Sequence, residues 1–87
     1  MAGNESSMQF PCTFPLKVMG LNTEAFEAAV RSLVESHVRS GPISYAKQPS
    51  RNGKYVSITA TFTAESREQL DMLYRALHSH ELVVMTL

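Results

Sequence analysis

The chain has 87 residues, of which 44% are hydrophobic and 18% are charged, a composition typical of one globular domain and not of a disordered tail. Eight Lys and Arg residues balance eight Asp and Glu residues, so the broad positive field that nucleic-acid-binding domains use is absent, although this balance leaves a local patch open. Cys12 is the only cysteine, which excludes an internal disulfide and a cluster of thiolate ligands within one chain.

The start of the chain predicts a short polar tail. Residues 1–9 are small and polar and are expected to be disordered, which leaves residues 10–87 as the domain. The tail lacks the basic and apolar regions of a signal peptide, and no apolar run approaches the length of a membrane span. We therefore expect a cytoplasmic protein without membrane association. Cys12, beside Pro11, is expected to be a half-exposed thiol with no special role.

A strand and a helix are predicted first. Apolar and other residues alternate over residues 13–19, the pattern of a strand with one buried face, and this strand is expected to stop at Gly20. Asn22 and Thr23 offer capping oxygens for a following helix. Arg39 is expected in its last turn, and Gly41-Pro42 is expected to end it. The buried face of this helix is predicted to consist of Phe26, Val30, Leu33, Val34 and Val38.

A hairpin is predicted next. Residues 43–48 read as a strand with Ile43, Tyr45 and Lys47 on one face, closed by Pro49 at a sheet edge. Residues 50–54 contain an Asn-Gly pair, which readily supplies the positive φ angles of a tight turn. Residues 55–62 then alternate strictly between apolar and polar side chains, which predicts the second strand of the hairpin.

The last third of the chain predicts a helix and a final strand. Ser66 with Gln69 matches a capping box, although Glu65 is an alternative cap residue. The helix is expected to end at residues 78–80, before a strand over residues 82–87 that is apolar on both faces. The apolar stripe of this helix is formed by Leu70, Leu73, Tyr74 and Leu77.

The order of these elements predicts an α+β fold. Strand, helix, strand, strand, helix, strand with right-handed crossovers gives a ferredoxin-like βαββαβ plait, a four-stranded antiparallel sheet with two helices on one face. The expected spatial order is fourth, first, third, second, which places the second and fourth strands at the edges.

Several short segments, spread over nearly all of the chain after the tail, carry a family resemblance. They are FPLKVMG (residues 14–20), QPS (48–50), GKYVSI (53–58), EQLDMLY (68–74) and VVMTL (83–87). They resemble the YbeD-like family of small bacterial proteins of uncharacterised function. The resemblance implies a ferredoxin-like plait similar to the ACT-type regulatory domains of amino-acid metabolism, with no catalytic residues to carry over. Genes of this family often lie beside those for protein lipoylation, which suggests a link to lipoate metabolism.

The turn after the first strand is the first candidate site. It comprises Gly20, Leu21, Asn22 and Thr23. In ACT-type domains a glycine at this turn lets a small ligand approach the backbone, and the helix N-terminus adds free N–H groups suited to a carboxylate. The simpler interpretation is that Gly20 satisfies a tight turn and that Asn22 caps the helix.

The predicted hairpin carries the second candidate site. Lys47, Arg51 and Lys54, with Ser50, surround the Asn-Gly turn and could hold a phosphate or an acidic partner. The simpler interpretation is a solvated hairpin tip whose charges keep an edge strand from aggregating.

Metal and nucleic-acid sites are not expected. His78, His80 and Glu81 lie close in sequence, but two histidines one residue apart on a helix point in different directions. An RNA-binding sheet would place aromatic rings mid-face, whereas the open face here offers Lys17, with Tyr55 at one end. The other polar side chains predicted on that face are Ser57, Thr59 and Thr61.

The final strand is the third candidate surface. If Val83, Met85 and Leu87 face the helices, then Leu82 and Val84 lie on the open face at an edge. Exposed apolar edges usually bind a partner, either a second copy or another protein, unless the chain before Phe14 covers them.

The sequence as a whole predicts a non-catalytic module. No nucleophile–base pair is evident, and residues 19–25 lack the arginine on which acylphosphatases of this fold depend, so we expect no enzyme and no cofactor. The leading hypothesis is an ACT-like regulatory or binding module for a small metabolite or a protein partner. The alternative is a protein-interaction module that uses the sheet edge and has no small ligand. An enzyme would require an active site shared across an oligomer.

Overall fold

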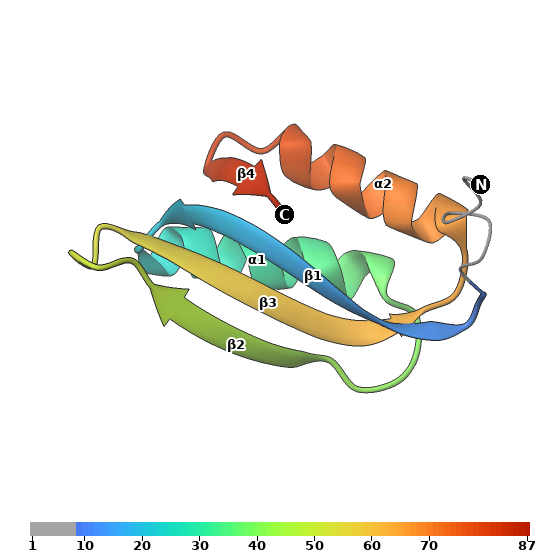
Figure 1. Cartoon of the computed structure of the whole chain (residues 1–87). Helices are drawn as coiled ribbons and strands as arrows, with labels where there is room; N and C mark the ends of the chain where they lie inside the picture. Colours follow the sequence, from blue (N-terminus) through green and yellow to red (C-terminus); the bar gives the residue numbers. More distant parts are fainter. Residues whose placement is uncertain (1–8) are drawn as a thin grey trace, which may run out of the picture.

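The computed structural model describes residues 9–87 and contains one four-stranded antiparallel sheet with two helices (Figure 1). In chain order the elements are β1 (Cys12–Leu21), α1 (Glu24–His37), β2 (Ser44–Pro49), β3 (Tyr55–Ala64), α2 (Arg67–His78) and β4 (Val83–Thr86). The strand order β2-β3-β1-β4 confirms the predicted α+β fold, with β2 and β4 at the edges. Of the predicted tail only Gln9 is described, so that prediction lies outside the described residues.

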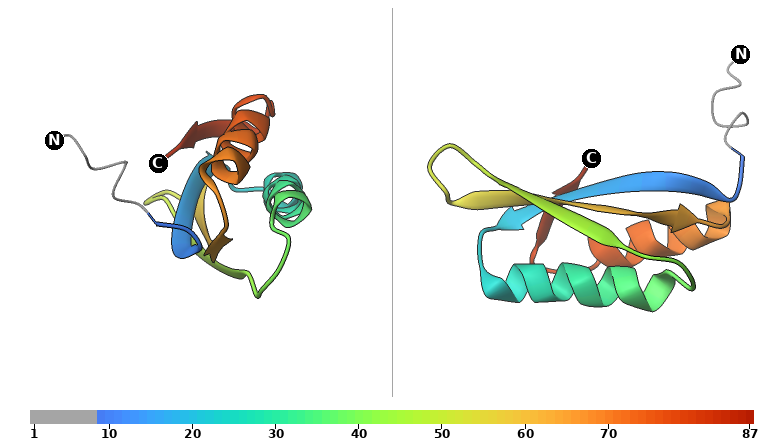
Figure 2. Two further views of the ribbon diagram at one scale, coloured as in Figure 1. Left: turned by 90° about the vertical axis from the view of Figure 1, so that its right-hand side faces the viewer. Right: turned by 90° about the horizontal axis from the view of Figure 1, so that it is seen from below.

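Both helices lie on the same side of the sheet, as the two further views in Figure 2 show. The opposite side, called the open face below, is covered by neither helix. Within residues 9–87, neither helix has the length and apolar character needed to cross a bilayer.

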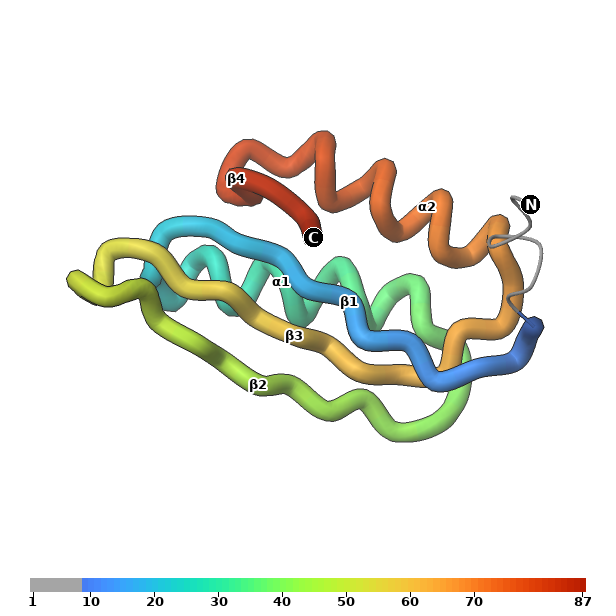
Figure 3. The backbone as a smooth tube through the Cα atoms, in the orientation of Figure 1, coloured from blue at the N-terminus to red at the C-terminus, as the bar shows by residue number. Residues whose placement is uncertain are grey.

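The long central pair of strands, β1 and β3, organises the sheet (Figure 3). Every residue of β1 has a partner in β3, from Cys12 opposite Ala64 to Leu21 opposite Tyr55. Directly opposed residues point to the same face of the sheet. The buried positions predicted for β1 therefore lie opposite the buried positions predicted for β3. By contrast, β4 pairs only with the end of β1, around Val18 to Gly20.

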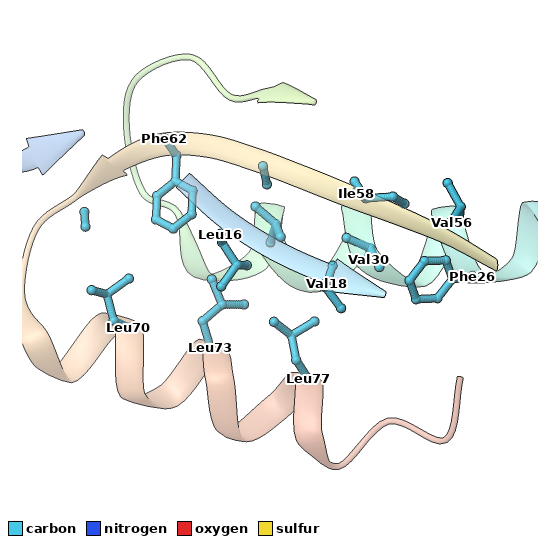
Figure 4. Close-up of a cluster of buried hydrophobic side chains, with 13 residues drawn as sticks. Leu16, Val18, Phe26, Val30, Val56, Ile58, Phe62, Leu70, Leu73 and Leu77 are labelled. Carbon is cyan, nitrogen blue, oxygen red and sulfur yellow. The ribbon is translucent and has the colours of Figure 1, made fainter. Parts of the chain in front are cut away.

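The core lies between the sheet and the helices (Figure 4). Each large apolar side chain buried there contributes about 1.5–3 kcal/mol relative to exposure. Its members come from both strands of the central pair and from both helices, and all of them are buried: Leu16, Val18, Phe26, Val30, Val34, Val56, Ile58, Ala60, Phe62, Ala64, Leu70, Leu73 and Leu77.

The turn between β2 and β3 confirms the predicted hairpin. Gly53 has a φ of 78°, in the left-handed region that the Asn-Gly signal favours. Its N–H donates to the Ser50 carbonyl at 2.9 Å, and the Asn52 side-chain oxygen accepts from the Lys54 N–H at 3.0 Å. These bonds fix the register of the two strands.

Side chains cap both helices at their N-termini. Thr23, and not Asn22, caps α1, since its hydroxyl accepts from the Phe26 N–H at 3.1 Å. Ser66 caps α2 by accepting from the Gln69 N–H at 3.0 Å. The Gln69 side chain accepts in turn from the Glu65 N–H at 2.7 Å, so Ser66 is the cap residue and Glu65 takes part in the capping only through its backbone.

The end of α1 differs from the prediction. The helix ends at His37, and Val38 is already extended, with φ −99° and ψ 118°. Arg39 therefore lies beyond the last turn, and Gly41-Pro42 lies in the connection to β2. Val38 packs against the core from its extended position, so tertiary packing ends the helix before the glycine is reached.

Candidate functional site

The loop around Gly20 is filled by protein atoms. A Cβ atom at this position would overlap the Phe26 ring, and it would lie 2.6 Å from the Leu82 carbonyl oxygen. The missing side chain thus lets β1, α1 and the loop before β4 approach one another. The structure explains Gly20 by packing, and the small-ligand role predicted for it stays without support from the geometry.

The turn after β1 and the β2–β3 hairpin, the first two candidate sites, lie side by side. The Asn22 N–H donates to the Lys54 carbonyl at 2.9 Å, and its side-chain amide donates to the Gly53 carbonyl at 3.2 Å. The loop before α1 is therefore fastened to the β2–β3 hairpin. Leu21, next to this junction, is 43% exposed.

The three hairpin cations do not converge on one site. Lys47 lies opposite buried Ile58, on the helix side of β2, and its ammonium group bonds Glu27 of α1 at 2.9 Å. Hydrogen bonding from Lys47 lowers the pKa of the Glu27 carboxyl below its usual value. Lys54 instead places its ammonium group 5.5 Å from the centre of the Tyr55 ring.

A polar network covers the β2 edge on the helix side. The Arg31 guanidinium lies 4.3 Å from the centre of the Tyr45 ring, and it also bonds Glu27 at 3.3 Å. The Tyr45 hydroxyl donates to Glu35 at 3.2 Å. Burial, with the charge and hydrogen bond of Glu35, raises the pKa of Tyr45 to about 12. This network ties β2 to α1 and was not apparent from the sequence, because its members lie far apart along the chain.

The two C-terminal histidines hold β4 in place. His78 Nε2 lies 2.7 Å from the Thr86 hydroxyl, and His80 Nδ1 accepts from the Leu82 N–H at 3.1 Å. Within residues 9–87, no group of three side chains is arranged to hold a metal ion. The histidines thus have structural partners that sequence reasoning did not identify.

The faces predicted for Leu82 and Met85 need correction, whereas Val83 packs against the core as predicted. Met85 pairs with Met19 of the open face and is 45% exposed, whereas Leu82 is half-buried against the core. The register shifts between Met19 and Gly20, and this irregularity resets the alternation that the prediction assumed to be unbroken. Val84 is 56% exposed, as expected for an edge residue.

A shallow hollow of about 390 Å³ lies between the end of α1 and the start of α2. Across it the Gln69 side chain donates to the His37 carbonyl at 2.8 Å. The residues that line the hollow come from both helices and from the loops beside them, and no sequence signal grouped them together: Ser36, His37, Arg39, Glu65, Ser66, Glu68, Gln69 and Met72. Its charged groups, Arg39, Glu65 and Glu68, are of both signs. Cys12, at the start of β1, is a free, half-exposed thiol, as predicted.

Comparisons with known proteins identify relatives along almost the whole chain. Residues 5–87 match the family model described as "Protein of unknown function (DUF493)". The UPF0250 protein of Nitrosomonas europaea is 43% identical over 84 residues, covering 95% of this chain and 97% of that protein. A UPF0250 protein of Neisseria meningitidis is 46% identical over 83 residues, covering 94% and 91% of the two chains.

Among solved structures, the fold matches the solution structure of protein HP0495 from H. pylori. The TM-score is 0.74 with 18% sequence identity, and the match covers 100% of this chain and 94% of that one. This likeness concerns the fold alone. The family match and the sequence relatives confirm the YbeD-like resemblance: the chain belongs to the DUF493 family of UPF0250 proteins.

Proposed function

We propose that this protein is a non-catalytic binding module that takes a protein partner along the β4 edge of its sheet. The observation that carries the proposal is a difference between the two sheet edges. The β2 edge carries a lysine and a proline. The β4 edge presents exposed apolar side chains beside backbone that is unpaired within residues 9–87.

The β2 edge has the features that keep strands apart. Pro49 cannot donate a hydrogen bond, Lys47 places a charge on the strand, and the Tyr45–Glu35 contact ties it to α1. Natural edge strands use such residues to prevent pairing with other chains.

The β4 edge has neither a proline nor a lysine, and its side-chain hydrogen bond to a helix is the one between Thr86 and His78 of α2. It is only four residues long and carries no charged residue. Val84 is 56% exposed, Met85 45% and Leu87 60%. The N–H of Leu87 donates to the Lys17 carbonyl, so that of Thr86 points away from β1 and has no backbone acceptor within residues 9–87. An extended segment of a partner can pair with this backbone and cover the apolar side chains.

Binding of a small metabolite is the second candidate, because the family resembles ACT-type regulatory domains. The feature that favours it is the 390 Å³ hollow between α1 and α2, which lies away from the Gly20 turn. A thermal-shift screen with amino acids, octanoate and lipoate tests it. A ligand at one hundred times its dissociation constant adds about 2.7 kcal/mol, a shift of roughly ten degrees or more in a domain of this size.

The edge proposal is tested by site-specific photo-crosslinking in cells of the organism from which the protein comes. A photoreactive residue at Met85 is expected to yield a discrete cross-linked protein. The same residue at Met72, an equally apolar position on α2 that is 59% exposed, is the matched control and is expected to yield none. A product of twice the chain's mass would identify a second copy as the partner.

A charge on the edge completes the experiment. Val84→Lys is expected to abolish the Met85 product while changing the free energy of unfolding by less than about 0.5 kcal/mol, since the side chain is exposed. The same product from both positions, or a Met85 product that survives Val84→Lys, would contradict the proposal.

A further inference from the structure

Charge is segregated between the two layers of this neutral chain. In residues 9–87 the strands and the β2–β3 hairpin contain no Asp or Glu, and every described carboxylate side chain lies in a helix or in a loop flanking one. The cations of the strand layer are Lys17, Lys47, Arg51 and Lys54. Lys47 is paired with Glu27 on the helix side, whereas Lys17 lies on the open face of β1 and Lys54 lies over the ring of Tyr55.

Apolar side chains gather on the open face beside these cations. Met19 lies opposite Ser57, and Leu21 lies opposite Tyr55, on the face turned away from the buried residues of both strands. Lys17 occupies the same face two residues before Met19. Met85 extends the apolar area across β4, since it pairs with Met19.

A hollow of about 210 Å³ opens between Met19 and the start of β3. Its walls are mainly apolar, and the Lys54 ammonium group lies above the Tyr55 ring that forms part of its rim. The residues that line it come from three strands and the hairpin: Met19, Gln48, Pro49, Ser50, Tyr55, Val56 and Ser57.

We infer that the open face docks an acidic segment of a partner protein, which inserts an apolar side chain into this hollow and places carboxylates against Lys17 and Lys54. The inference deepens the proposed function, on which it rests, by naming the partner's chemistry and a second contact surface. The apolar anchor supplies most of the affinity. The exposed cations, each worth little alone, set the sign of the partner's charge and the rate of encounter.

A protein segment fits this surface better than single-stranded RNA does. RNA-binding sheets stack successive bases on aromatic rings in mid-face. Here the central positions of β3 are Ser57, Thr59 and Thr61, and Tyr55 stands at one end. Aliphatic Met19 and Leu21 suit a leucine or methionine anchor.

The test is a selection of random 15-residue peptides displayed against the full chain. Enriched peptides are expected to be net negative with a large apolar residue, and to shift the amide resonances of Met19, Leu21 and Tyr55. Lys17→Glu combined with Lys54→Glu is expected to weaken their binding about tenfold or more. Arg67→Glu with Arg75→Glu, the same charge change on exposed positions of α2, is the matched control and is expected to change it less than twofold.

Three results would overturn the inference: no acidic enrichment, equal losses in both double variants, or amide shifts confined to α1 and α2. Tighter binding of a uridine 12-mer to the same residues would assign the face to nucleic acid and would also overturn it. These failures are separable from those of the proposed function, because the peptide selection tests the hollow beside Met19, whereas the loss of the Met85 cross-link in Val84→Lys tests the β4 edge.

Discussion

Gly20 lies where β1, α1 and the loop before β4 meet, and its role shows how a packing glycine can resemble a ligand-binding one. In the sequence it is a glycine between a strand and a helix N-terminus, which suits a small anion as well as a tight turn. In the structure the Phe26 ring and the Leu82 carbonyl occupy the space that a side chain would need. Only the three-dimensional neighbours distinguish the two interpretations.

Gly20→Ala is therefore expected to destabilise the fold by about 3 kcal/mol, the upper end of typical overpacking costs, because one of the opposing atoms is a backbone oxygen. Urea unfolding measures the loss. Gly53→Ala is the matched control: it has open space around it but a positive φ, and should cost only about 1–2 kcal/mol. A Gly20→Ala protein as stable as the wild type would refute the packing role.

At the scale of elements, the parts that could be predicted are those with local signals. The Asn52-Gly53 turn and the Ser66 cap were correctly placed, because a dihedral requirement and a nearby hydrogen bond specify each of them. The end of α1 could not be placed, since the core contact of Val38 outweighs the downstream glycine signal. The faces predicted for Leu82 and Met85 were wrong because a register shift leaves no trace in the apolar pattern.

The contact between β2 and α1 gives a prediction for pH dependence. The pKa of Glu27 is lowered in the folded state, chiefly by its hydrogen bond from Lys47, so the unfolded chain binds the proton more tightly. The stabilisation is present above the unfolded pKa, near 4.5, and is lost as the pH falls through the lower folded pKa.

Thermal melts at pH 7 and pH 3 measure this loss. Glu27→Gln is expected to shrink the drop in Tm between the two pH values, whereas Glu81→Gln, in the loop before β4, should leave the drop as in the wild type. An unchanged drop in Glu27→Gln would show that the Lys47 contact contributes nothing to acid stability.

At the scale of the whole molecule, the net charge is zero, but the described strands and the β2–β3 hairpin carry basic residues and no Asp or Glu. The balanced composition predicts no broad positive field but leaves a local patch open. The absence of Asp and Glu from all predicted strands was readable in the sequence, but its meaning depends on which strands share a face. Likewise, the β2 edge is distinguished by Pro49 and by Lys47, whose partner Glu27 on α1 appears only in the fold.

The central claim is that a partner adds to the sheet along β4. Its most direct test is amide hydrogen exchange in the ¹⁵N-labelled protein, alone and with the partner captured at Met85. We predict that exchange of the Thr86 amide slows about tenfold or more on binding, because this outward-pointing N–H gains an acceptor. Unchanged exchange at Thr86, with slowing confined to α1 or α2, would contradict the claim and place the binding surface on the helices.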